Sequence, residues 1–177
     1  MRSTYSTAIL SALKVGIPVV TAIGNDGSQT SGSPGNDFFA FAVGATDSAD
    51  RAAGFSGGRT QIITHSDFFE PAQLPLVYSK PDVSAPGVAV YSSLPGRQWG
   101  YLNGTSKAAP HVAGAIALLL SATKIKSSVA RTQRAFVIQD LLTGSAEELG
   151  EAGQNHRFGF GRIDVLRTIG FARKLGY

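Results

Sequence analysis

Residues 103–114 read Asn-Gly-Thr-Ser-Lys-Ala-Ala-Pro-His-Val-Ala-Gly. Ser106 follows a Gly-Thr pair and opens an apolar segment that continues to about Leu120, so the pattern predicts a helix that begins at this serine. The first N–H groups of a helix lack partners within it, and the helix dipole favours negative charge there. Ser106 therefore has the surroundings of a nucleophile beside which an oxyanion forms, although serine is also a common helix cap.

The segment resembles the nucleophile motif of the subtilisin-like serine proteases, Gly-Thr-Ser-x-Ala-x-Pro-His. Three other stretches match that family in the same order along the chain: 17–27 (Ile-Pro-Val-Val-Thr-Ala-Ile-Gly-Asn-Asp-Gly), 41–56 and 80–95. Residues 158–165 are similar to the run that precedes the family's last helix. The resemblance covers nearly the whole chain. It implies an α/β fold, with a layered parallel sheet and helices on both faces.

The upstream part of the catalytic triad is absent from this sequence. The family's triad runs Asp, His, Ser along the chain. His65 is the only histidine that precedes Ser106 in the sequence, and no His-Gly-Thr-His segment surrounds it. Six aspartates precede Ser106, and none lies in an Asp-Thr-Gly setting: Asp26, Asp37, Asp47, Asp50, Asp67 and Asp82. We therefore expect residues 1–177 to be the C-terminal part of a protease domain whose N-terminal half is missing. The alternative is a non-catalytic binding module or pseudoenzyme that kept the scaffold.

Short apolar runs alternate with helical patterns, as in a parallel α/β domain. The periodicity predicts a helix over 3–15. Three runs predict strands: 17–23, 38–46 and 88–94. Residues 54–80 lack periodicity and are longer than the corresponding connection of the small subtilisins. We expect a surface insertion there, with one short hairpin around 61–64.

Three helices are expected in the second half of the chain. The segment from Ser106 to about Leu120 is apolar all round, which predicts burial on all sides. A helix over 129–142 should bury a stripe formed by four residues: Phe136, Val137, Leu141 and Leu142. The last helix should run from about 163 to 174.

Composition excludes several classes of protein. The chain has no cysteine, which excludes disulfides and thiolate metal sites. Its net charge is +4 and its basic residues are scattered, so no nucleic-acid surface is expected. No apolar run approaches the ~20 residues of a membrane span, so no membrane partner is expected.

The resemblance also implies the remaining site residues. Asn25 would be an oxyanion donor beside the Ser106 N–H, although Asn-Asp-Gly also forms turns. Gly32 would form the base of the primary specificity pocket and Asp26 its rim. Three further residues would contact substrate near the oxyanion site: Ala22, Ile23 and Gly24. Thr105, which precedes the nucleophile, is the last predicted contact.

Other residues have weaker assignments. His111 lies five positions after Ser106, about 140° around the helix axis, so we expect a buried structural histidine and not the base. Lys107 departs from the family, which usually has Met there. Catalysis should need no cofactor; structural calcium is possible but not indicated, and only Asp47 lies where some relatives bind a cation. Expected partners are a polypeptide substrate, the missing half and, through an exposed sheet edge, a second copy. The family resemblance suggests secretion.

Overall fold

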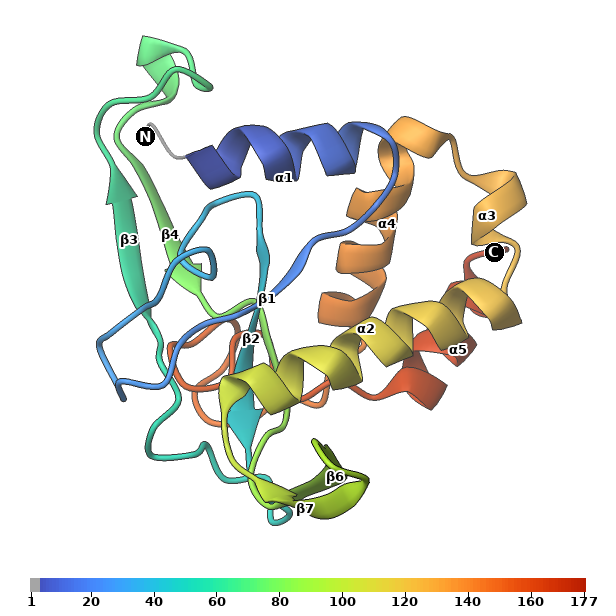
Figure 1. Ribbon diagram of the computed structural model, residues 1–177. Helices are drawn as coiled ribbons and strands as arrows, with labels where there is room; N and C mark the ends of the chain where they lie inside the picture. Colours follow the sequence, from blue (N-terminus) through green and yellow to red (C-terminus); the bar gives the residue numbers. More distant parts are fainter. Residues whose placement is uncertain (1–3) are drawn as a thin grey trace.

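The computed structural model describes residues 4–177, and its centre is a three-stranded parallel sheet (Figure 1). The strand order is β1 (Val20–Ala22), β2 (Phe41–Thr46), β5 (Val83–Pro86). Every residue of β2 is buried, because packed segments cover both of its faces. The predicted α/β fold with a parallel sheet is therefore confirmed.

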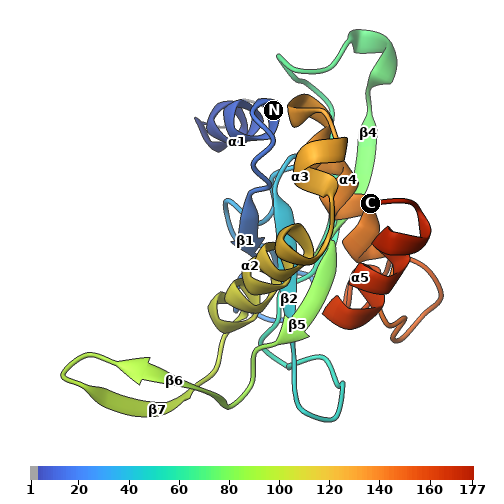
Figure 2. The same ribbon diagram turned by 90° about the vertical axis from the view of Figure 1, so that its right-hand side faces the viewer.

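Within residues 4–177 the structure has five α-helices: α1 (Thr4–Lys14), α2 (Thr105–Ala122), α3 (Ile125–Ser128), α4 (Arg131–Gly144) and α5 (Val165–Lys174). Helix α2 lies across all three strands, and α4 and α5 extend the same core (Figure 2). Fully buried aliphatic side chains from the sheet and these helices form that core: Val43, Val83, Val112, Leu119, Ile138 and Leu142. Helix α1 packs against α4 in a smaller cluster.

A strand is present where residues 88–94 predicted one, but it does not belong to the parallel sheet. The third strand is β5, whose ladder ends when Gly87 donates to the Thr46 carbonyl, at 2.9 Å. The chain then turns away through Ala89, which has a φ of 51°. Strands β6 (Val90–Leu94) and β7 (Gln98–Leu102) form an antiparallel hairpin that projects from the molecule (Figure 2).

The region expected to be an insertion contains a long hairpin. Strand β3 (Arg59–Ile63) pairs antiparallel with β4 (Leu76–Lys80), and the connection carries a short 3₁₀ helix, η1 (Pro71–Gln73). A hairpin is present where residues 61–64 predicted one, but its second strand begins far beyond that range.

Helix α2 is not buried on all sides. Its inner face contributes Val112 and Leu119 to the core, whereas Leu118 is 56% exposed. The outward positions include Ala113 and Ala117, so an apolar stripe faces solvent. The stripe predicted for α4 also needs correction: Leu141 and Leu142 are buried, but Phe136 is 44% exposed and Ile138 takes the inner position instead.

Candidate active site

Ser106 is exposed as the second residue of α2, and a glycine shapes the turn that precedes it. Gly104 has a φ of 149°, and a Cβ on it would lie only 3.1 Å from the Ser106 Oγ. The Gly104 N–H donates to the Gly87 carbonyl at 2.8 Å, directly after β5. The sheet therefore holds the start of α2, and glycine keeps the space beside the hydroxyl open.

Asn25 lies beside this turn, three residues after the end of β1. Its Oδ1 accepts two hydrogen bonds from Thr105, one from the backbone N–H at 2.8 Å and one from the hydroxyl at 2.9 Å. A backbone N–H can only donate, so the Asn25 atom that faces it must be the oxygen. The Asn25 amide nitrogen is therefore turned away from Thr105, where it can donate a hydrogen bond to a ligand.

The amide nitrogen and the serine hydroxyl flank the same space. The position that a Cβ on Gly104 would take lies 3.1 Å from the Ser106 Oγ and 3.8 Å from the Asn25 Nδ2. Thr105 also accepts a hydrogen bond from the Gly24 N–H at 3.3 Å. The structure thus brings together Ser106, Asn25, Thr105 and Gly24.

Two glycines form the backbone contact behind this space. The Gly32 N–H donates to the Ile23 carbonyl at 2.6 Å. Gly24 has a φ of 114°, and a Cβ on it would lie 3.0 Å from the Gly32 nitrogen. The side chain of Ile23 is buried and points into the core, so only its backbone is placed for a ligand. Ala22 is the last residue of β1, and Asp26 is exposed.

None of the chain's histidines is bonded to Ser106 in residues 4–177, which contain all three. The His111 Nδ1 lies 2.8 Å from the Lys107 carbonyl oxygen, so the predicted bond to backbone is present, but the residue is exposed and the predicted burial is wrong. His65 is bonded to the Thr64 hydroxyl. The His156 Nε2 lies 2.7 Å from the Thr60 Oγ1.

The Asp47 carboxylate is already engaged by N–H donors. It accepts from the Ala49 and Arg51 backbone N–H groups and from the Arg51 guanidinium, at 2.8–3.0 Å. These bonds hold the pKa of Asp47 below its ordinary value. Within residues 4–177 no three His, Cys, Asp or Glu side chains gather as they would around a metal ion. Over the same range, no helix is both long and apolar enough to cross a membrane.

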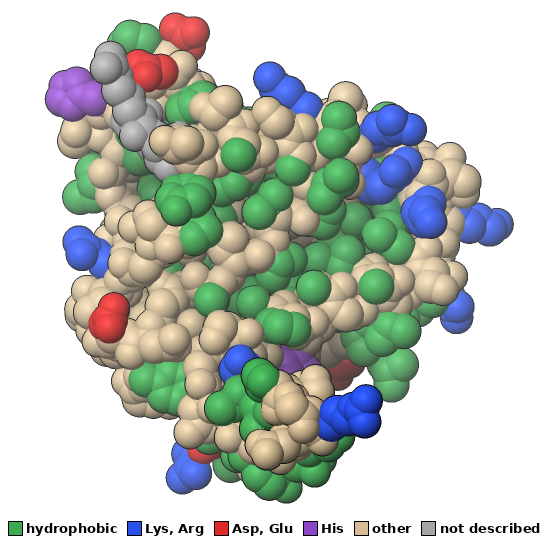
Figure 3. Space-filling view, in the orientation of Figure 1, with side chains coloured by type: hydrophobic (Ala, Val, Ile, Leu, Met, Phe, Trp, Pro, Cys, Tyr) green, Lys and Arg blue, Asp and Glu red, His purple; other side chains and the backbone are tan. Residues whose placement is uncertain are grey.

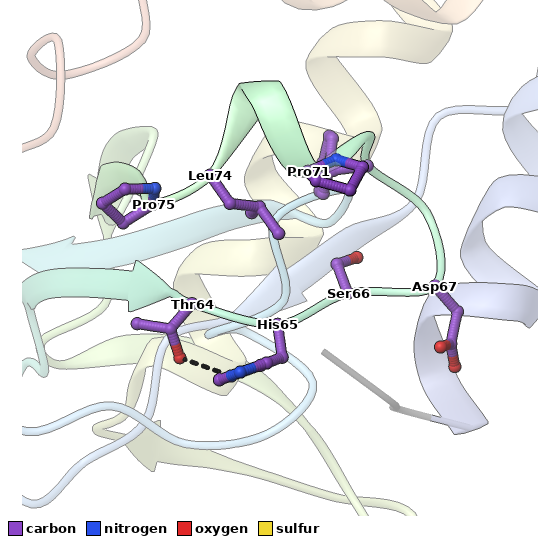
Figure 4. Close-up of a pocket in the computed structure, with 8 residues that line it drawn as sticks. Thr64, His65, Ser66, Asp67, Pro71, Leu74 and Pro75 are labelled. Carbon is purple, nitrogen blue, oxygen red and sulfur yellow. Dashed lines mark hydrogen bonds between the residues drawn. The ribbon is translucent and has the colours of Figure 1, made fainter.

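A separate hollow lies in the connection between β3 and β4 (Figure 4). It has a volume of ≈ 760 Å³ and is lined by Thr64, His65, Ser66, Asp67, Phe69, Pro71, Leu74 and Pro75. The figure shows the Thr64 hydroxyl bonded to the His65 ring. The hollow shares no residue with the Ser106 site, so we do not count it as part of the candidate active site.

Comparison with known proteins identifies the family. A model described as the subtilase family matches residues 2–161. The chain belongs to the subtilase family. It matches the C-terminal part of the subtilase domain, as the order of its motifs predicted.

The similarity extends to curated proteins and to a solved structure. The chain is 32% identical to a thermophilic serine proteinase of Bacillus sp. (strain AK1), over 94% of this chain and 34% of that protein. It is 36% identical to subtilisin DY of Bacillus licheniformis, over 89% of this chain and 48% of that one. The chain thus spans between a third and a half of these relatives' length. The prenylagaramide maturation protease PagA superposes with a TM-score of 0.73 at 25% identity, over 97% of this chain and 57% of that one.

Proposed function

We propose that this chain is the C-terminal part of a subtilisin-like serine endopeptidase that cleaves peptide bonds by acyl transfer. The observation that carries the proposal is the pair of hydrogen bonds from Thr105 to the Asn25 Oδ1, which turns the Asn25 amide toward the space beside Ser106. Within a family of serine proteinases, this arrangement suits a nucleophile and an oxyanion donor.

The mechanism follows from these positions. The Ser106 Oγ attacks the peptide carbonyl and loses its proton to a base. The Asn25 Nδ2 and the Ser106 N–H bind the oxygen that becomes negative in the tetrahedral intermediate. The intermediate collapses to an ester on Ser106 while the amine leaves with the proton. Water then attacks the ester, with the same base accepting a proton, and releases the acid and the serine.

We propose that the base comes from an N-terminal half that carries the family's Asp and His. Two observations support this. The three histidines of the chain are bonded elsewhere, to Thr64, Lys107 and Thr60. The chain also covers 34% to 48% of the relatives described above. We call the assembly of this chain with such a half the complete domain.

Since no histidine within residues 4–177 is bonded to Ser106, a second candidate is a binding module without catalysis. Hydrolysis of a panel of peptide amides by the complete domain separates the two. Turnover that needs Ser106 supports the peptidase, whereas peptide binding without turnover supports the module.

The first prediction concerns association. Among residues 4–177, no strand pairs with the outer edge of β1. Apolar side chains gather over α1, α2 and the segment between α1 and β1 (Figure 3), where Val15, Ile17 and Leu118 are each about half exposed. An open strand edge beside an apolar surface favours association. The isolated chain should therefore dimerise or aggregate as its concentration rises, and sedimentation measures this.

Adding the N-terminal half should suppress that association if it covers the same surface. A chain that stays a compact monomer across the concentration series and unfolds at a high temperature would contradict the prediction.

The second prediction concerns specificity. Gly32 leaves no side chain at the expected base of the pocket, so the complete domain should accept large apolar or aromatic side chains before the scissile bond. The exposed carboxylate of Asp26 should favour Lys over Glu there by about two- to five-fold, and salt should weaken the effect. The measurement is kcat/KM for peptides with Phe, Leu, Lys, Glu or Ala at that position.

The control for the charge effect is Asp26→Asn at low and high ionic strength. A Lys/Glu ratio that does not change in this variant removes Asp26 from the pocket. A preference for Ala over Phe shows instead that the pocket is blocked and that Gly32 is misassigned.

A further inference from the structure

The β3–β4 hairpin lies along the loop that contains Gly32. We call residues 23–40, which join β1 to β2, the pocket loop. The contact begins just before β3, where the Gly57 N–H donates to the Gly24 carbonyl at 3.0 Å and the Gly58 N–H donates to the Thr30 carbonyl at 2.8 Å. The strand that enters the hairpin therefore runs directly against the backbone of the pocket loop.

Two side chains from opposite strands of the hairpin continue this contact on either side of Gly32. Gln61 on β3 donates from its Nε2 to the Ser31 hydroxyl at 2.8 Å. Tyr78 on β4 donates from its hydroxyl to the Asn36 carbonyl at 2.7 Å. Gln61 and Tyr78 are directly opposite each other in the hairpin register. One cross-strand pair thus holds both arms of the turn around Gly32.

The Tyr78 hydroxyl remains a hydrogen-bond donor to the Asn36 carbonyl. Burial raises the pKa of Tyr78 to about 12, with help from the charges of Asp37 and Asp82, so the hydroxyl stays protonated and keeps donating. Its ring packs edge-on against Phe38 with centroids 5.1 Å apart. Phe69, from the connection between β3 and β4, packs against the Phe38 ring with centroids 5.2 Å apart.

A buried ammonium group fixes the end of the pocket loop. Lys80, the last residue of β4, donates from its Nζ to the Ala40 carbonyl at 2.6 Å and to the Asp82 carboxylate at 2.8 Å. Asp82 in turn accepts from the Ala42 N–H at 2.6 Å. If Lys80 and Asp82 were separated, each would be left as a buried charge without its partner, which is unfavourable. This pair therefore keeps the end of β4 in place against the pocket loop and the sheet.

The polar contacts on either side of Gly32 are discrete. The hairpin and the loop enclose a hollow of ≈ 460 Å³ whose lining includes Ser33, Asn36, Asp37, Gln61 and Tyr78. On the side of the hairpin the turn around Gly32 is thus held at a few points, whereas on its other side it lies against the backbone of Ala22 and Ile23. Single substitutions at the hairpin contacts should therefore loosen the turn without removing the core.

We propose that the β3–β4 hairpin positions the primary specificity pocket, and that Gln61 and Tyr78 are positioning residues for it. The proposal rests on the function proposed above. A wall made of Gly24 and Gly32 has no side chain, so its place is set by the backbone alone. The residues that hold this backbone therefore determine whether the pocket accepts a large apolar substrate side chain at the position before the scissile bond.

The first test measures the loop itself. Amide hydrogen exchange of residues 28–37 should be faster in Gln61→Ala and in Tyr78→Phe than in the unaltered protein. Val77→Thr is the matched control, because Val77 is exposed on the same strand and next to Tyr78. Exchange that is unchanged in both variants, or equally fast in the control, overturns the proposal. This readout needs no activity, so it judges the hairpin even if the complete domain proves inactive.

The second test separates positioning from general support. In the complete domain, each variant should lower the ratio of kcat/KM for Phe over Ala before the scissile bond by about 2- to 10-fold, the range of one hydrogen bond, mainly through KM. Ser31→Ala should match Gln61→Ala, and the double variant should add nothing further. An equal loss for both substrates overturns the proposal. A complete domain that hydrolyses neither substrate before any substitution contradicts the proposed function instead.

Discussion

Replacing Ser106 by alanine in the complete domain should lower kcat for peptide hydrolysis by about 10⁶. That value was measured in subtilisin, a member of this family, and we borrow it. The physical reason is that the proposed mechanism forms the acyl intermediate on the Ser106 hydroxyl, which is exposed at the start of α2. Steady-state hydrolysis of peptide amides, with a single-turnover limit for the variant, measures the effect.

Ser121→Ala is the control, because Ser121 is exposed on the same helix, near its other end. It should retain the kcat of the unaltered domain. A Ser106→Ala domain that keeps more than about one hundredth of the activity would show that another group is the nucleophile.

Replacing Asn25 by alanine should lower kcat by about 10²–10³ with little change in KM, because the oxyanion forms only after attack. This range also comes from subtilisin and is borrowed. In the unaltered domain, Thr105 holds the Asn25 oxygen through hydrogen bonds of 2.8 and 2.9 Å, and this leaves the amide nitrogen beside Ser106. The alanine variant lacks that nitrogen and therefore lacks the donor. Burst and steady-state kinetics of the complete domain separate the effects on kcat and KM.

Variants of Thr105 test how Asn25 is oriented. Thr105→Val removes the hydroxyl bond to the Asn25 Oδ1 and the bond accepted from the Gly24 N–H, and it should lower kcat by about 2- to 10-fold. Thr105→Ser keeps the hydroxyl and should preserve kcat. An Asn25→Ala domain whose KM rises while kcat stays constant would place Asn25 in ground-state binding and not in the oxyanion site.

The sequence predicted two of the three strands of the central sheet and the start of the helix that carries Ser106, because both depend on local patterns. The short apolar runs before Asn25 and around Val43 indicated buried strands, and β1 and β2 lie within them. A Gly-Thr pair before an apolar run indicated the helix start at Ser106, and α2 begins at Thr105. The boundaries were less accurate, since the strand predicted over 17–23 is limited to Val20–Ala22.

Errors arose where pairing depends on distant segments. Residues 88–94 have the composition of a strand, but nothing in them indicates that Gly87 turns the chain out of the sheet toward β7. The hairpin contacts to the pocket loop were likewise missed. Gln61 and Tyr78 are ordinary residues in an irregular stretch, and only the fold brings them to Ser31 and Asn36.

The exposed side of α2 has a different cause. An apolar helix predicts burial on all sides, yet Leu118 and His111 face solvent in residues 4–177. Apolar composition indicates that burial of a helix face is favourable, but it does not indicate which segment buries that face. A further segment of the protein that covers this face would reconcile the composition with the structure.

Covalent labelling by a fluorophosphonate tests whether Ser106 is a nucleophile whose base lies outside this chain. The probe should be added to residues 1–177 alone, to the complete domain, and to the complete domain with Ser106→Ala, and the labelled peptide identified by mass spectrometry. We expect rapid labelling at Ser106 in the complete domain only. Rapid labelling of Ser106 in the isolated chain, or labelling of the complete domain at another residue, would contradict it.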